Sequence, residues 1–287
     1  MPRGIDHLVL CVSDLKKART QYEKLGFTMT PDAQHPFGTG NTLAQFDGCF
    51  LEVLAVTRPQ LISEADGNDF SFAAFNRDFL QHGEGMSMLV LDSTDEVADR
   101  DDFQSKGLHV YAPFDFQRLA RLPDGSEQTV GFSLTFTADE SLPDMGFFTC
   151  RQWRPDLFWK QEYQRHANGA ARIDEVFIVA PEPVAPATFL AAFADSHDME
   201  TGDGFAKVVT TRGKLSVYTP AAFDDKFPGA FPAKALTKPR FAGFAIETAD
   251  PDAAAALWGE HGFDVQGGGE KAWLGPDEGM GCVIAAV

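Results

Sequence analysis

One order of segments, a β-rich run, a helix and three further β-rich runs, recurs along this sequence. In its first copy, apolar residues at helical spacing predict a helix over 15–25, with Asp14 as its N-cap and Gly26 as its stop. The strands of this copy are predicted at 5–12, 27–30, 41–46 and 49–56. Because an internal repeat constrains the architecture before any single residue does, the copy predicts a βαβββ unit.

Three later segments repeat this order, beginning at 86–95, 172–180 and 241–247. The predicted fold class is therefore α+β, with four βαβββ units paired into two curved-sheet domains. The segment 153–170, rich in Arg, Gln, Trp and Pro, interrupts the pattern, so we expect a first domain at 1–152, a junction at 153–170 and a second domain at 171–287. In the second unit, 108–111 is predicted as a strand and the charged run 99–102 as a solvated helix face.

The sequence is strongly acidic, with 24 Lys and Arg against 42 Asp and Glu and a formal net charge of −18. Nucleic acids are bound through clusters of Lys and Arg, so we expect no nucleic-acid partner. Cys11, Cys49, Cys150 and Cys282 lie far apart without a CxxC motif, which predicts reduced core thiols. Neither an apolar leader nor a run of about 18 apolar residues occurs, so we expect a cytoplasmic protein without membrane contact.

Two polar residues interrupt apolar strands: His7 in the first predicted strand and Glu52 in the fourth. Burial of an unpaired carboxylate is costly, so Glu52 needs a metal ion, an Arg or a hydrogen-bonded ligand as its partner. An imidazole and a carboxylate that face one hollow from two strands form half of an octahedral site for Zn, Mn, Ni or Fe. His7 and Glu52 are therefore the predicted metal ligands.

Other polar residues are candidates for the rest of the site. A third metal ligand is first expected at His35, and then at Gln152 or His166. His35 and Glu52 are also candidate catalytic residues, because a desolvated Glu52 that leaves the metal could act as a base. The candidates for substrate binding are Asn41, Gln152, Arg154 and His166. Dinucleotide, nucleotide and serine-hydrolase functions have no support, because the sequence lacks their glycine-rich and nucleophile-elbow motifs.

These residues resemble the vicinal oxygen chelate superfamily, which includes glyoxalases, bleomycin-resistance proteins and extradiol dioxygenases. The resemblance is carried by the run GIDHLVL at 4–10, the helix exit LGF at 25–27 and the run CFLEV at 49–53. The run HPFGTGN at 35–41 is similar to the signature of the glyoxalase-like domain group. The resemblance implies paired βαβββ units that curl around a metal or ligand cleft, with His7 and Glu52 at the ligand positions of the first unit.

The second unit departs from the pattern that the resemblance implies. In metal-binding members the second unit supplies the remaining ligands from its own first and fourth strands. Here those strands offer Met88, and Thr149 or Cys150, in the corresponding places. The third unit offers Glu175 and the fourth Gly243, so the second domain is expected to hold no metal.

Three functions are compatible with these residues. The first is a metal-assisted lyase or isomerase that acts on a small oxygen-rich substrate, with the metal on His7 and Glu52. The second is a metal-free protein that binds an apolar or aromatic small molecule, for which the 26 Phe residues are suited. The third is an extradiol-type dioxygenase, which needs a second histidine ligand. We expect a small-molecule partner, and a homodimer is left open.

Overall fold

The computed structural model describes residues 2–121, 125–268 and 271–287. Its first half contains the strands β1 (Ile5–Cys11), β2 (Ala33–Gln34), β3 (Thr39–Gln45), β4 (Phe50–Val56), β5 (Gly85–Asp92), β6 (Phe114–Arg121), β7 (Glu127–Thr137) and β8 (Gly146–Gln152). The helices of this half are α1 (Leu15–Lys24), α2 (Phe72–Phe79), α3 (Glu96–Ser105) and α4 (Pro155–Phe158), with short 3₁₀ turns at η1 (Pro59–Leu61), η2 (Leu80–His82) and η3 (Gln161–Tyr163).

The second half repeats this arrangement. Its strands are β9 (Ala170–Val179), β10 (Met199–Gly202), β11 (Phe205–Val209), β12 (Lys214–Tyr218), β13 (Arg240–Thr248), β14 (Gln266–Gly268), β15 (Lys271–Leu274) and β16 (Val283–Ala286). Its helices are α5 (Val184–Ala194), α6 (Pro220–Lys226) and α7 (Pro251–Glu260), with a 3₁₀ turn at η4 (Ala233–Leu236).

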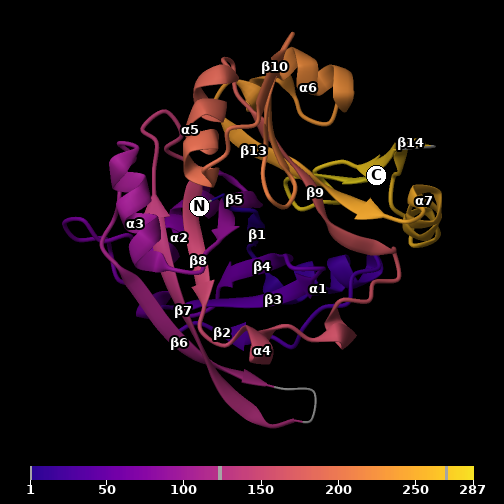
Figure 1. Ribbon diagram of the computed structural model, residues 1–287. Coiled ribbons are helices and arrows are strands. Elements are labelled where there is room, and N and C mark those ends of the chain that lie inside the picture. The colour runs from indigo at the N-terminus through magenta and orange to yellow at the C-terminus, as the bar shows by residue number, and fades with distance from the viewer. Residues whose placement is uncertain (1, 122–124, 269–270) are drawn as a thin grey trace.

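Two eight-stranded sheets carry the fold, and their strands follow the same order. Figure 1 shows the first half of the chain in indigo to magenta and the second in orange to yellow. The first sheet runs β2-β3-β4-β1-β5-β8-β7-β6, and the second runs β10-β11-β12-β9-β13-β16-β15-β14. In every unit the first strand pairs in parallel with the last, and two units meet through an antiparallel pair, β1 with β5 or β9 with β13. The predicted fold of four βαβββ units in two curved sheets is confirmed, whereas the domain limits stay predictions.

The predicted helix signals act as expected in the first unit. The side chain of Asp14 accepts a hydrogen bond from the backbone N–H of Lys17 at 3.0 Å, which satisfies a free donor at the start of α1. Gly26 follows the helix with a φ of +89°, a conformation that costs glycine little and other residues more. Asp95 and Asp250 cap α3 and α7 in the same way.

Two short predicted strands are wrong, because neither 27–30 nor 108–111 is extended in a ladder. Thr30 forms three hydrogen bonds with β3: its N–H donates to the carbonyl of Leu43, its hydroxyl accepts from the N–H of Leu43, and its carbonyl accepts from the Thr42 hydroxyl at 2.7 Å. The edge of the first sheet is instead formed by the two-residue strand β2, which pairs with β3 and contacts β6 across the open side of the sheet. The first sheet therefore curls until its edge strands approach each other.

The run 99–102 is also not a fully solvated helix face. Asp99 is buried, and it accepts hydrogen bonds from Arg3 Nη2 at 2.8 Å and from Thr149 Oγ1 at 2.7 Å. Arg3 in turn donates to the backbone carbonyl of Phe193 in α5. The Asp99 carboxylate can be buried because its partner is the guanidinium of Arg3, a cation that is itself buried between the two halves.

The faces of β1 separate two apolar regions. Leu8 and Leu10 belong to a large core that contains residues of both sheets and of the helices. Val9 and Cys11, on the opposite face, belong to a second cluster in the hollow of the first sheet. Because side chains alternate along a strand, His7 faces the same side as Val9 and Cys11. The hollow therefore receives a polar residue from an otherwise apolar strand.

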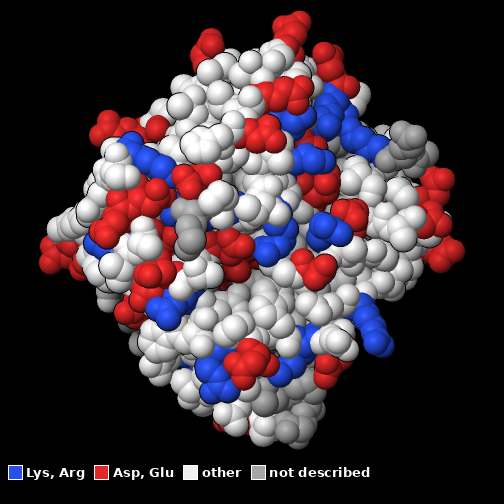
Figure 2. All heavy atoms as spheres, viewed as in Figure 1, with Lys and Arg blue, Asp and Glu red and all other residues white. Residues whose placement is uncertain are grey.

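No helix in the described part of the chain is long and apolar enough to cross a membrane. Figure 2 shows Asp and Glu side chains spread over the face in view, with Lys and Arg between them. A mixed surface of this kind agrees with the excess of acidic residues in the sequence.

Candidate functional site

His7 and Glu52 meet in the hollow of the first sheet. They come from the neighbouring parallel strands β1 and β4, where Val9 is paired with Glu52 and His7 with Phe50. Nε2 of His7 lies 3.7 Å from Oε2 of Glu52, and both side chains are about 5% exposed. The distance exceeds that of a hydrogen bond, so the two groups face each other without one.

The ring of His7 is held in one orientation. Its Nδ1 lies 2.6 Å from Oδ2 of Asp6, and the ring stacks on Phe50 with 4.3 Å between the centroids. Neighbouring residues can share a side because the pairing of β1 with β5 is irregular at this point. Since a carboxylate only accepts, Nδ1 donates to Asp6 and Nε2 faces Glu52. Gln152 donates to the other oxygen of Asp6 at 3.3 Å.

His35 and Asn41 approach Glu52 from the other side. Nε2 of His35 lies 3.8 Å from Oε1 of Glu52, and Asn41 donates to the same oxygen at 2.5 Å. The Asn41 amide also lies 3.3 Å from Nε2 of His35, while Nδ1 of that ring lies 2.8 Å from the Thr39 hydroxyl. Burial, followed by the positive charge of Arg118 and by His7, holds the pKa of His35 well below its usual range. His35 is therefore a neutral imidazole whose Nε2 lone pair faces the hollow.

An inner cavity of about 40 Å³ adjoins these residues. His7, His35, Asn41 and Glu52 of the first unit form most of its polar wall, Arg118 of β6 adds a cation from the second unit, and the remaining lining is mostly aromatic. The aromatic residues are Phe37, Phe50, Phe72, Phe116, Phe132, Phe148 and Phe158. Closely packed rings exclude water, which strengthens every electrostatic interaction inside the cavity.

The second unit contributes apolar side chains at the places of His7 and Glu52. The strand register aligns β5 and β8 with β1 and β4, so Met88 corresponds to His7 and Phe148 to Glu52. Thr149 or Cys150 was expected at the place of Glu52, and this expectation is wrong. Leu89 pairs with Phe147 as Leu8 pairs with Leu51, so the residue that corresponds to Glu52 is Phe148. At these two places the hollow is therefore polar in the first unit and apolar in the second.

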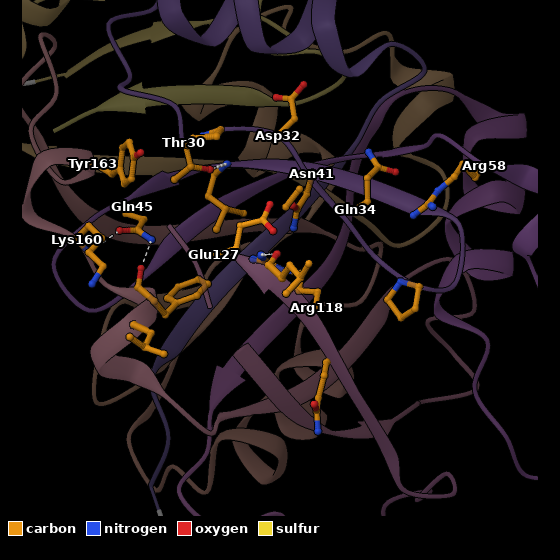
Figure 3. A pocket seen from close by; sticks show the side chains of 18 residues that line it. Thr30, Asp32, Gln34, Asn41, Gln45, Arg58, Arg118, Glu127, Lys160 and Tyr163 are labelled. Carbon is orange, nitrogen blue, oxygen red and sulfur yellow. Dashed lines mark hydrogen bonds between the residues drawn. The ribbon is translucent and has the colours of Figure 1, made fainter. Parts of the chain in front are cut away.

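A larger outer cleft of about 540 Å³ shares Asn41, Leu43, Arg118 and Phe158 with the inner cavity. Figure 3 shows Arg118 next to Asn41 in the middle of this cleft, with Arg58 at one end and Lys160 and Tyr163 at the other. The cleft is open enough to admit a small molecule, and its shared residues form the entrance to the inner cavity.

Arg118 is a site residue that the sequence analysis missed. It follows Phe114 and Phe116 on β6 at alternate positions, and both rings pack in the hollow. The same period of two places Arg118 on the inner face, and this was the signal available in the sequence. Burial lowers the pKa of its guanidinium, while Glu52 acts in the opposite direction.

The other predicted substrate-binding residues lie elsewhere. Gln152 lies behind Asp6 rather than in either cavity lining. Arg154 is exposed and pairs with Asp156 at 2.8 Å. His166 lies 3.0 Å from the backbone N–H of Thr28 and 2.7 Å from the carbonyl of Gln45, so it fastens the segment after η3 to the first sheet.

His7, His35 and Glu52 fit a divalent ion by the chemistry of their donors. The Nε2 atoms of both rings face the buried carboxylate of Glu52, and the Nδ1 atom of each ring lies at hydrogen-bond distance from a neighbouring oxygen. The spacing is wider than in a formed site, and no group of three or more His, Cys, Asp or Glu in the described residues is arranged to hold a metal ion. An ion would therefore require Glu52 to turn from Asn41 toward the two rings.

The second sheet carries different residues at the corresponding places. By strand register, Glu175 of β9 corresponds to His7 of β1, and Ser216 of β12 corresponds to Glu52 of β4. Glu175 accepts a hydrogen bond from the Tyr218 hydroxyl at 2.7 Å and lies 3.9 Å from Lys226 Nζ. The negative charge of Glu175 is therefore compensated within the protein.

Comparisons with known proteins agree with this geometry. The sequence model described as a glyoxalase-like domain matches residues 5–194. No curated protein matches the chain. A hypothetical protein from Staphylococcus aureus has a similar structure, with a TM-score of 0.70, 12% sequence identity, and coverage of 99% of each chain.

Two further solved structures share the fold. A mutant of 4-hydroxymandelate synthase from Streptomyces coelicolor has a TM-score of 0.61 at 11% identity, covering 99% of this chain and 92% of the other. The Mn(II)-bound glyoxalase from Novosphingobium aromaticivorans has a TM-score of 0.56 at 11% identity, covering 100% of this chain and 82% of the other. At these identities the likeness concerns the fold alone.

Proposed function

Because this chain belongs to the family of glyoxalase-like domains, a part of the vicinal oxygen chelate superfamily, we propose that it is a metal-assisted lyase or isomerase for a small oxygen-rich substrate. The observation that carries the proposal is the approach of two imidazole Nε2 atoms, at 3.7 and 3.8 Å, to the two oxygens of the buried Glu52. His7, His35 and Glu52 would hold a Zn, Mn, Ni or Fe ion.

When bound, a divalent ion would polarise the substrate oxygens and stabilise the negative charge that develops on them. Asp6 fixes the His7 ring so that Nε2 faces the hollow. A Glu52 that leaves the metal would be held through Oε1 by Asn41, and its Oε2 would then be the oxygen able to accept a proton from the substrate. The aromatic lining of the inner cavity excludes water from this proton transfer.

Elemental analysis tests the proposal. Protein purified without chelator or immobilised metal is expected to contain about one divalent ion per chain, and His7→Ala and Glu52→Gln are expected to lose the ion together with turnover. Glu175→Gln is the matched control, because Glu175 holds the place of His7 in the second sheet and should not affect metal content. Unchanged metal content in both His7→Ala and Glu52→Gln would contradict the proposal.

A second candidate function is favoured by the apolar half of the hollow. Met88 and Phe148 stand where metal-binding members would carry ligands, and phenylalanine rings dominate the cavity. This supports a metal-free protein that binds an apolar small molecule. It predicts that the wild-type protein takes up none of the four metals, even after incubation with each, and that it still binds an aromatic ligand.

A further inference from the structure

Three buried polar atoms without a hydrogen-bond partner line the same outer cleft. Among the described residues, they are Oδ1 of Asn41, Nε of Arg58 and Nε of Arg118. Asn41 is almost fully buried, and both arginines are partly buried with their Nε atoms shielded from solvent. Buried polar groups are nearly always paired in folded proteins, so three unpaired ones around one cleft indicate groups that a ligand satisfies.

Each of the two arginines makes one side-chain hydrogen bond among the described residues, to a backbone carbonyl. Arg58 donates through Nη2 to the carbonyl of His35, and Arg118 donates through Nη1 to the carbonyl of Leu119 at 3.3 Å. No carboxylate among the described residues forms an ion pair with either guanidinium. A guanidinium presents donors in a planar fork that matches a carboxylate, which makes a carboxylate the expected partner of each.

Two acidic residues also line the cleft, but neither forms an ion pair with Arg58 or Arg118. Asp32 is paired with Arg19 at 2.6 Å, and Glu127 is exposed on β7. Lys160 adds a third cation at the opposite end of the cleft (Figure 3). In a chain with a net charge of −18, a cleft lined by three cations is a local exception that favours an anion.

We infer that the outer cleft binds a small hydroxydicarboxylate, with one carboxylate on Arg118, the other on Arg58, and a hydroxyl that donates to Oδ1 of Asn41. The inference rests on the proposed function, because it names the substrate class of that same site. The two carboxylates account for two separate guanidinium groups, and the hydroxyl accounts for an unpaired acceptor next to Glu52. Binding at Arg118 would bring the hydroxylated carbon to the entrance of the inner cavity.

Isothermal titration calorimetry with defined acids tests this assignment. The probes are malate, 2-hydroxyglutarate and 2-hydroxyadipate, with succinate, glutarate and adipate as partners without the hydroxyl and lactate as the monocarboxylate. At least one hydroxydicarboxylate is expected to bind, its unhydroxylated partner more weakly, and lactate more weakly still. Lactate binding as tightly as every dicarboxylate, or the absence of binding by all dicarboxylates, would overturn the inference.

Variants assign the charges to residues. Arg58→Gln and Arg118→Gln are each expected to raise the Kd of the best hydroxydicarboxylate about tenfold to a hundredfold, the usual effect of losing a charge-assisted hydrogen bond. Arg118→Lys keeps the charge without the fork and should restore part of the affinity. Arg154→Gln is the matched control, since Arg154 is exposed, pairs with Asp156 and does not line the cleft.

The metal content of every sample, measured before and after titration, separates this inference from the proposed function. Neither arginine is a metal donor, so both glutamine variants should keep the metal content of the wild-type protein. Wild-type affinity in the double variant Arg58→Gln, Arg118→Gln overturns the inference at any metal content. Normal hydroxydicarboxylate binding by protein whose metal does not depend on His7 or Glu52 supports the inference and contradicts the proposed function.

Discussion

At the scale of single residues, the hydrogen bond between Asp6 and His7 decides which ring nitrogen is available in the hollow. Nδ1 is held at 2.6 Å by Asp6, and Asp6 is itself held by Gln152. Such an outer carboxylate fixes both the tautomer and the rotation of a histidine ring. The position of Nε2 therefore depends on a residue that does not line the cavity.

We expect Asp6→Asn to weaken metal binding about tenfold to a hundredfold without unfolding the protein, because an amide fixes the His7 tautomer less firmly than a carboxylate does. Titration of the metal-free protein with Mn²⁺ or Zn²⁺ measures the effect. Asp174→Asn is the matched control. Asp174 occupies in β9 the position that Asp6 occupies in β1, but it pairs with Lys214 at 3.1 Å. Equal affinity in both variants would argue against this role for Asp6.

The sequence made His7 and Glu52 recognisable because polar groups in apolar strands require partners. It also led to His35, whose ring lies beside Glu52. It did not locate Arg154 or His166 correctly relative to the cavities, because the course of the segment after β8 depends on tertiary contacts such as that between His166 and Gln45. The alternation of Phe114, Phe116 and Arg118 along β6 would have predicted that Arg118 faces the hollow.

At the scale of elements, the loop before β16 packs closely against the loop before β5, and the contact is made by Gly281. Gly281 has a φ of +89°, and a Cβ added there would lie 1.8 Å from the backbone carbonyl oxygen of Glu84, just before β5. Backbone atoms cannot move aside as the end of a side chain can. The close approach of these two loops therefore requires glycine.

Gly281→Ala is expected to lower the free energy of unfolding by clearly more than the roughly 1–2 kcal/mol that a left-handed conformation alone costs. Gly229→Ala is the matched control, since Gly229 has a φ of +73° with no atom within 4 Å of the added Cβ. Urea denaturation of both variants measures the difference. Equal losses would mean that the contact with Glu84 adjusts freely.

The repeated units could be predicted from local signals, since the helices of the first, second and fourth units each begin at an Asp N-cap. The edges of the sheets could not, because 27–30 and 108–111 have suitable residues for strands but no partner strand in register. Which segment forms the edge strand depends on how strongly the sheet curls. In the first sheet the curl brings the edge strands β2 and β6 into contact. Local sequence contains little information about that curvature.

At the scale of the whole molecule, charged groups connect the two halves between α3 and α5. Lys106 Nζ donates to Asp102 at 2.9 Å, to Asp195 at 2.6 Å and to the backbone carbonyl of Ala192 at 3.2 Å. The hydrogen bond from Lys106 is the main cause that lowers the pKa of Asp195 to about 2. The ionised form of Asp195 is therefore favoured by folding.

This shift predicts an acid-sensitive contribution to stability. Because the folded pKa is depressed, Asp195 contributes fully above its unfolded pKa of about 3.9, and the contribution is lost as the pH falls from about 4 toward 2. The difference in unfolding free energy between the wild-type protein and Asp195→Asn should be constant from pH 5 to 7 and shrink below pH 4. Urea denaturation at a series of pH values measures it, and a constant difference down to pH 2.5 would contradict the assignment.

The large core shared by the two sheets has a consequence for biosynthesis. Phe147 in β8 packs against Phe189 and Phe193 of α5 and against Phe241 of β13. When the ribosome has released the first eight strands, the partners of this surface have not yet been translated. The apolar surface around Phe147 is therefore expected to be protected, by chaperones or by delayed folding, until the carboxyl-terminal half has been translated.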